Sequence, residues 1–104
     1  MKIGINGFGR IGRLVLRILW QREDIEITHI NEIGGDSFAA SHLLEFDSVH
    51  GRWNKHITSN KDEIIVEGKR ITFTSTKNYL DVPWHKSSVD LILECTEKTK
   101  PPKT

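Results

Sequence analysis

A cluster of three glycines near the start of the chain restricts the fold more than any other feature. Gly7, Gly9 and Gly12 lie between a short apolar segment and a helical pattern. Residues 2–6 are apolar and β-branched, which predicts a buried parallel strand. From residue 10 to about residue 22, apolar residues recur at spacings of three and four, which predicts an amphipathic helix. A strand, a glycine turn and a helix in this order favour an α/β fold.

A second strand and a second helix follow the first pair. The first helix is predicted to bury a stripe made of Ile11, Leu14, Val15, Ile18 and Leu19. Residues 24–30 are the next strand candidate, and the glycines after them let the chain turn. Asp36 is the predicted N-cap of a helix that runs through residue 46. The residues predicted to be buried on this helix are Phe38, Leu43 and Leu44.

The pattern changes after residue 51. Residues 55–58, 63–67 and 70–74 are short strand candidates, and the last two are predicted to form a hairpin that turns at Gly68-Lys69. Ile71 and Phe73 alternate with polar residues, which indicates a strand with one buried face. Residues 89–93 are an apolar strand candidate that we expect to be central in a complete sheet.

The spacing of the glycines predicts an anion-binding loop. The pattern is G-x-G-x-x-G, formed by Gly7, Phe8, Gly9, Arg10, Ile11 and Gly12. The first glycine permits a tight turn, the second lets the backbone approach a phosphate, and the third lets the helix pack closely on the strand. Backbone amides at the start of the helix then bind the anion. The loop therefore predicts a site for the pyrophosphate of a dinucleotide.

Glu32 extends this prediction to the choice of cofactor. It lies twenty positions after Gly12, at the end of the second predicted strand, where an acidic residue hydrogen-bonds the adenosine ribose. A carboxylate repels a 2′-phosphate, so NAD is favoured over NADP. The alternative interpretation of Glu32 is a solvated loop residue. The expected fold is α/β, part of a doubly wound parallel sheet of the Rossmann type with a small antiparallel hairpin inserted.

Composition excludes several other classes of protein. The chain has 104 residues, enough for one small domain. Its net charge is +1, and basic and acidic residues are interspersed along the chain, so no nucleic-acid partner is expected. No apolar stretch is long enough for a membrane span or a signal peptide. The five histidines show no metal-ligand spacing, so no metal is expected. Cys95 is the single cysteine, which favours a reducing, cytoplasmic location.

Several segments resemble one known family. Residues 5–13, 30–32, 46–51, 83–84 and 89–96 are similar, in this order and at similar spacing, to segments of the glyceraldehyde-3-phosphate dehydrogenase family. The resemblance covers residues 1–96, and the first and third segments are highly specific. Glu32, in place of the commoner aspartate, is similar to the erythrose-4-phosphate dehydrogenase and arsenate-associated branches.

The resemblance implies a set of NAD-binding residues. The backbone of Arg10 and Ile11 would cradle the pyrophosphate, and Glu32 would hold the adenosine ribose. Lys77 stands where the family has a basic residue beside the adenine, and Cys95 and Thr96 would lie along the cofactor. The complete implied set is Gly7, Phe8, Gly9, Arg10, Ile11, Gly12, Asn31, Glu32, Lys77, Cys95 and Thr96.

Two departures from the family pattern affect the expected function. Glu97 replaces a glycine that passes close to the dinucleotide, and residues 97–104 carry two prolines and no apolar residue, which predicts a disordered cationic tail. The expected domain is a truncated dinucleotide-binding domain over residues 1–96 without a catalytic domain. We interpret Cys95 as a structural residue, because the motifs of the family's nucleophilic cysteine and its histidine are missing.

Two functions are compatible with these features. The first is the NAD-binding portion of an oxidoreductase that acts on a phosphorylated aldehyde and is not catalytic alone. The second is a non-enzymatic interaction or dimerisation module whose cofactor site has decayed at Glu97. In either case an unpaired edge at residues 89–93 predicts self-association into a homo-oligomer.

Overall fold

The computed structural model describes residues 1–47 and 51–96, and the predicted tail over residues 97–104 lies outside this range. The strands are β1 (Lys2–Asn6), β2 (Glu26–Asn31), β3 (Phe46–Asp47), β4 (Gly51–Arg52), β5 (Ile57–Asn60), β6 (Glu63–Val66), β7 (Lys69–Thr74) and β8 (Leu91–Glu94). The helices are α1 (Arg10–Leu19) and α2 (Ser37–Glu45), with two short 3-10 helices, η1 (Tyr79–Asp81) and η2 (Trp84–Ser87).

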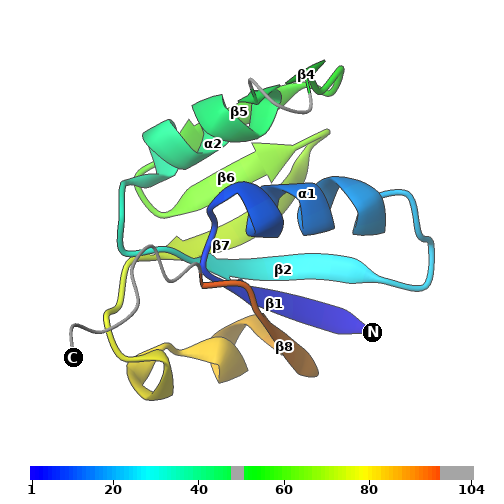
Figure 1. Ribbon diagram of the computed structural model, residues 1–104. Helices are drawn as coiled ribbons and strands as arrows, with labels where there is room; N and C mark the ends of the chain where they lie inside the picture. Colours follow the sequence, from blue (N-terminus) through cyan, green and yellow to red (C-terminus); the bar gives the residue numbers. More distant parts are fainter. Residues whose placement is uncertain (48–50, 97–104) are drawn as a thin grey trace, which may run out of the picture.

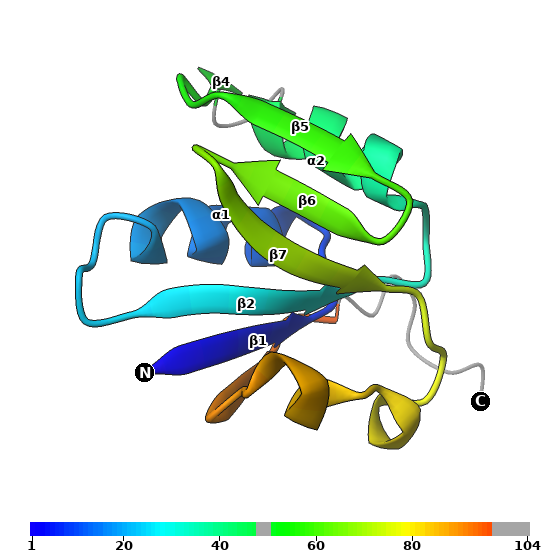
Figure 2. The same ribbon diagram turned by 180° about the vertical axis from the view of Figure 1, so that it is seen from behind.

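The described strands form one large sheet in the order β5-β6-β7-β2-β1-β8 and a small sheet of β3 and β4 (Figure 1). The strands β7, β2, β1 and β8 are parallel, while β5 and β6 are antiparallel additions beside β7. Both α-helices lie on the same face of the large sheet (Figures 1 and 2). The predicted α/β fold with a mostly parallel sheet is confirmed, and the antiparallel hairpin extends that sheet.

The buried core lies mainly between the sheet and the two α-helices. Its fully buried large side chains are Ile5, Leu16, Ile30, Leu44, Ile64, Ile71 and Val66. Most of them come from strands, where apolar residues alternate with more exposed ones, as in β7. Burial of each such side chain stabilises the fold by about 1.5–3 kcal/mol.

The predicted buried stripe of α1 is partly wrong. Ile11 and Ile18 are 52% and 57% exposed, whereas Gly12, Leu16 and Arg17 are the buried positions of the helix. The glycine sets this orientation, because it packs directly on the turn that precedes the helix. Arg17 is buried since its guanidinium donates to the carbonyl oxygen of Leu44 at 2.6 Å, at the end of α2. The helix also ends earlier than predicted.

The predicted buried face of α2 is wrong in two of its three residues. Phe38 and Leu43 are 55% and 44% exposed, and only Leu44 is fully buried. The other buried positions of this helix are the small residues Ser37, Ala40 and Ser41. Small side chains let α2 approach β5 closely, and the Ser41 hydroxyl lies 3.1 Å from that of Ser59.

Two local predictions concern the ends of elements. The predicted N-cap of α2 is confirmed, because the Asp36 carboxylate accepts a hydrogen bond from the Ala39 amide at 2.8 Å. The hairpin between β6 and β7 turns at Glu67-Gly68, one residue earlier than predicted, and both residues have a positive φ. The strand predicted over residues 89–93 corresponds to β8 (Leu91–Glu94), which is an edge strand of the sheet within the described residues.

Candidate functional site

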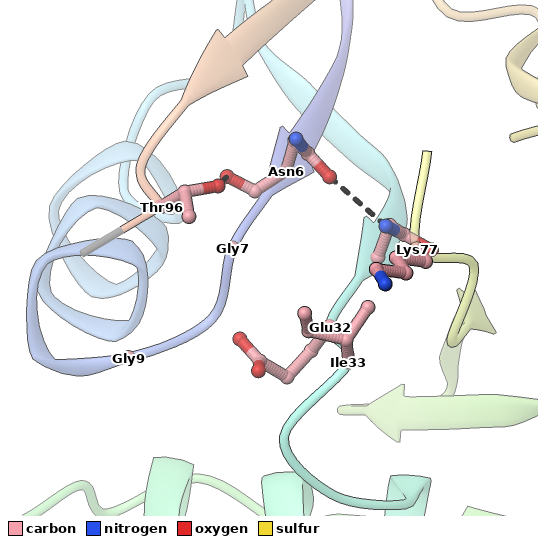
Figure 3. Close-up of a pocket in the computed structure, with 8 residues that line it drawn as sticks. Asn6, Gly7, Gly9, Glu32, Ile33, Lys77 and Thr96 are labelled. Carbon is pink, nitrogen blue, oxygen red and sulfur yellow. Dashed lines mark hydrogen bonds between the residues drawn. The ribbon is translucent and has the colours of Figure 1, made fainter. Parts of the chain in front are cut away.

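The carboxyl ends of the parallel strands surround the candidate site. A cleft of about 280 Å³ opens there, beside the turn between β1 and α1. It is lined by Asn6, Gly7, Gly9, Asn31, Glu32, Ile33, Lys77 and Thr96. Figure 3 shows Asn6 and Thr96 on one side of this cleft and Glu32 and Ile33 on the other. Ligands of open α/β sheets bind at this edge, outside the carboxyl ends of the strands.

The turn that borders the cleft requires glycine at two positions. Gly7 has a φ of +94°, and a Cβ atom there would lie 2.5 Å from the backbone nitrogen of Thr96. A Cβ atom at Gly12 would lie 2.3 Å from the carbonyl oxygen of Gly7. Both distances are far inside van der Waals contact and involve backbone atoms, so neither position accepts a side chain without movement of the main chain. The sequence prediction gave these two glycines the same tasks.

The start of α1 is open to an anion. Gly9 is the N-cap of this helix and has no side chain to cap its first amides, and the first turn carries no acidic residue. Amides of a first helical turn have no partner within the helix, and the helix dipole adds a partial positive charge there. The end of α1 that faces the cleft can therefore bind a phosphate group.

Glu32 joins the glycine turn to the loop after β2. Its Oε1 accepts a hydrogen bond from the amide of Phe8, and its Oε2 accepts one from the amide of Gly34 at 2.6 Å. A carboxylate has about four acceptor positions, so two remain for hydroxyl groups of a ligand. The carboxylate is thus held beside the phosphate-binding turn, where it can accept the hydroxyls of a ribose.

A row of polar side chains lies at the end of the four parallel strands. Asn6, Asn31, Thr74 and Glu94 are the last residues of β1, β2, β7 and β8. Asn6 Nδ2 donates to the Glu94 carboxylate at 2.9 Å, and this bond together with Thr96 lowers the pKa of Glu94. Asn6 lines the cleft but was not among the predicted site residues, although its place at the end of an apolar strand is the signal that would have found it.

His29 lies behind this row. Its ring is fully buried, and its Nε2 and Nδ1 atoms lie 2.9 Å and 2.8 Å from the hydroxyls of Thr74 and Ser87. The Trp84 ring packs against it with the ring centres 4.6 Å apart. Burial lowers the pKa of His29 to about 4, so the imidazole is neutral near pH 7. No sequence motif singles out His29.

The remaining predicted residues lie beside the cleft without lining it. The Phe8 side chain is in the core and only its amide reaches the site, while Arg10 and Ile11 begin α1 with exposed side chains. Cys95 is buried, and burial together with the Glu94 charge raises the pKa of its thiol. A thiol of this kind is a poor nucleophile. Glu97 lies outside the described residues.

A parallel sheet, a glycine turn that leads into a helix, and a carboxylate at the end of the neighbouring strand define a dinucleotide-binding domain. The sequence model of a family described as "Glyceraldehyde 3-phosphate dehydrogenase, NAD binding domain" matches residues 1–101. The chain belongs to the glyceraldehyde-3-phosphate dehydrogenase family and corresponds to its NAD-binding domain. Across the described residues, neither α-helix is long and apolar enough to cross a membrane.

Curated relatives agree with this assignment. The chain is 46% identical over 104 residues to glyceraldehyde-3-phosphate dehydrogenase 3 of Nostoc sp., a match that covers all of the chain and 31% of that protein. It is 46% identical over 98 residues to glyceraldehyde-3-phosphate dehydrogenase of Chlamydia pneumoniae, covering 92% of the chain and 29% of that protein. It is 43% identical over 94 residues to glyceraldehyde-3-phosphate dehydrogenase of Debaryomyces hansenii, covering 90% of the chain and 28% of that protein. The chain thus spans less than a third of these relatives.

Proposed function

We propose that the chain binds NAD in the cleft at the carboxyl edge of the sheet. The first-turn amides of α1 take the pyrophosphate, Glu32 accepts the hydroxyls of the adenosine ribose, and Lys77 lies beside the adenine. The observation that carries this proposal is the position of the Glu32 carboxylate, which hydrogen-bonds the amide of Phe8 within the glycine turn. A negative charge there discriminates against the 2′-phosphate of NADP.

The parent activity is the oxidation of a phosphorylated aldehyde with transfer of hydride to NAD. Such chemistry needs a thiolate that attacks the aldehyde and a histidine that accepts its proton. Cys95 does not serve as the nucleophile, because it is buried and its thiol pKa is raised. These 104 residues therefore bind the cofactor and perform no hydride transfer alone. A turnover assay with NAD and glyceraldehyde 3-phosphate or erythrose 4-phosphate should stay at background.

We also propose that the chain self-associates. Self-association is also what the alternative function, a dimerisation module, requires. Within the described residues β8 pairs with β1 on one side and is open on the other, and Leu91 of this strand is 46% exposed. An open strand edge pairs readily with a second copy of the same strand. Sedimentation velocity should therefore show dimers, and a strictly monomeric chain at high concentration would contradict this.

Two finer assignments are proposed on sequence grounds. The first is a position near the erythrose-4-phosphate dehydrogenase and arsenate-associated branches of the family, which rests on Glu32. The second is a cytoplasmic location, which rests on Cys95 as the single cysteine of the chain. Cell fractionation with an antibody to the chain tests the location.

Calorimetric titration with NAD and NADP tests the cofactor proposal. The wild-type chain should bind NAD and discriminate against NADP. Glu32→Gln should weaken NAD binding about tenfold or more, because it replaces hydrogen bonds to a charged acceptor. Glu23→Gln is the matched control, since Glu23 is exposed in the loop between α1 and β2. NAD binding by Glu97→Gly alone would instead mean that the chain derives from a dehydrogenase whose cofactor site was lost at this position, and no binding by either chain would favour the interaction module.

A further inference from the structure

The side chain of Asn31 has an unusually complete set of hydrogen-bond partners. Its Oδ1 atom accepts from the Thr74 hydroxyl at 2.8 Å and from the Thr76 amide at 2.9 Å. Its Nδ2 atom donates to the Asn6 Oδ1 atom and to the Thr76 carbonyl oxygen, both at 2.9 Å. A carboxamide has two acceptor lone pairs and two donor hydrogens. All four positions are occupied within the protein.

The orientation of this carboxamide is fixed by the backbone. The Thr76 amide can only donate and the Thr76 carbonyl oxygen can only accept, so Oδ1 and Nδ2 of Asn31 cannot exchange places. The Thr74 hydroxyl must then donate to Oδ1, and Asn6 must present its own oxygen to Nδ2. Asn6 Nδ2 is thereby directed to Glu94. One side chain therefore determines the orientation of its neighbours on β1 and β7.

Asn31 also holds the segment that carries Lys77. Thr76 directly precedes Lys77, and both polar atoms of the Thr76 main chain are bonded to Asn31. Lys77 is exposed and lines the cleft, whereas Asn31 is only 3% exposed. The buried carboxamide of Asn31, the last residue of β2, therefore lies at the floor of the cleft, next to Glu32 in the chain and bonded to the segment that carries Lys77.

We propose that Asn31 is a positioning residue for the cofactor cleft, and not a direct ligand of the dinucleotide. It clamps the Thr76 backbone and so fixes Lys77, and it sets which polar atoms Asn6 presents to the cleft. This inference rests on the proposed NAD binding, and it changes the role that the family resemblance implies for Asn31. Without free donors or acceptors, the side chain contributes to binding only through Lys77 and Asn6.

A double-mutant cycle tests this assignment. Asn31→Ala should raise the NAD dissociation constant about fivefold, the equivalent of one net hydrogen bond, when Lys77 is present. In a Lys77→Met background the same change should have a clearly smaller effect, because the residue that Asn31 positions is gone. Thr28→Val is the control for a general disturbance of β2 and should leave NAD affinity unchanged. Equal losses in both backgrounds would overturn the positioning of Lys77 by Asn31.

Hydrogen exchange supplies a readout that does not depend on NAD. The Thr76 amide should exchange slowly in the wild-type chain and at least tenfold faster in Asn31→Ala. If Asn31→Ala does not fold, Thr74→Val, which removes one of the four bonds, should give a smaller change in the same direction, and Thr74→Ser should restore it. Fast exchange of this amide in the wild-type chain would overturn the clamp.

The two proposals fail in different ways. A wild-type chain that binds no NAD would contradict the proposed function, and the exchange of Thr76 would then still decide whether Asn31 clamps this segment. A wild-type chain that binds NAD, with Asn31→Ala losing affinity equally with and without Lys77, would retain the function and overturn the positioning of Lys77 by Asn31.

Discussion

Acidification from pH 7 to pH 5 should destabilise the fold through His29. Its pKa is about 4 in the folded chain, against an ordinary value of 6.5, because the ring is buried. The unfolded state therefore binds a proton in this range while the folded state does not, so stability falls as the pH falls below about 6.5. Between pH 7 and pH 5 this linkage amounts to about 2 kcal/mol.

The groups that contact the ring support this direction. Thr74, Ser87 and Trp84, the described residues that bond to or pack against the ring in these contacts, are uncharged, so none of the three stabilises an imidazolium. Because Thr74 Oγ1 donates to Asn31, it accepts from His29 Nε2, and the neutral ring accepts from Ser87 at Nδ1. Protonation would place a hydrogen on Nδ1, so the Ser87 hydroxyl would have to accept instead of donate. The loss should saturate near pH 4, where the folded state begins to bind the same proton.

Thermal unfolding followed by circular dichroism at pH 7, 6 and 5 measures the effect. The midpoint should fall by roughly 10 °C between pH 7 and pH 5, from the usual relation between stability and melting temperature for a domain of this size. His29→Gln keeps a polar side chain that does not titrate and should remove most of the dependence. The measurements stop at pH 5 because Glu63 and Glu94 have lowered pKa values in the folded chain, so their protonation would cause a further loss of stability at lower pH. An unchanged midpoint in the wild-type chain, or the same slope in His29→Gln, would refute the reasoning.

Three further predictions follow from single contacts. Gly12→Ala should destabilise the chain by about 1–3 kcal/mol and abolish NAD binding, because its Cβ would lie 2.3 Å from the Gly7 carbonyl oxygen; normal stability in urea titration would contradict this. Thr28→Val should stabilise the chain by about 1 kcal/mol, since the Thr28 hydroxyl is buried without a hydrogen-bond partner among the described residues; a loss of stability would reveal a partner. Cys95 should react with iodoacetamide roughly ten times more slowly in the folded chain than in urea, and equal rates would show that it is accessible.

The sheet could be predicted because its signals are local. Short β-branched segments and the glycine spacing locate the strands and the turn between β1 and α1 without knowledge of tertiary contacts. The buried faces of the helices could not be predicted in the same way. Arg17 is buried because it reaches carbonyl groups at the end of α2, and Ser41 is buried because a small residue permits close packing on β5. Both depend on which elements become neighbours.

The candidate site, too, could be predicted only where its residues follow a local sequence pattern. Glu32 was predicted from its spacing to the glycines, and it lies at the cleft beside them. The polar row that includes Asn6, Thr74 and Glu94 depends on the order and register of β1, β7 and β8, which no local pattern specifies. The role proposed for Asn31 could not be inferred from its identity either. It follows from the four partners that the assembled strands bring to one carboxamide.

Nuclear magnetic resonance titration of the isotope-labelled chain with NAD reports cofactor binding and its location together. We expect the backbone amide signals of Gly7, Gly9, Glu32 and Thr96 to shift on addition of NAD, while that of Glu23 does not. Addition of NADP should shift them much less. No shifts with NAD, or shifts confined to residues away from the carboxyl edge of the sheet, would show that this cleft does not bind NAD.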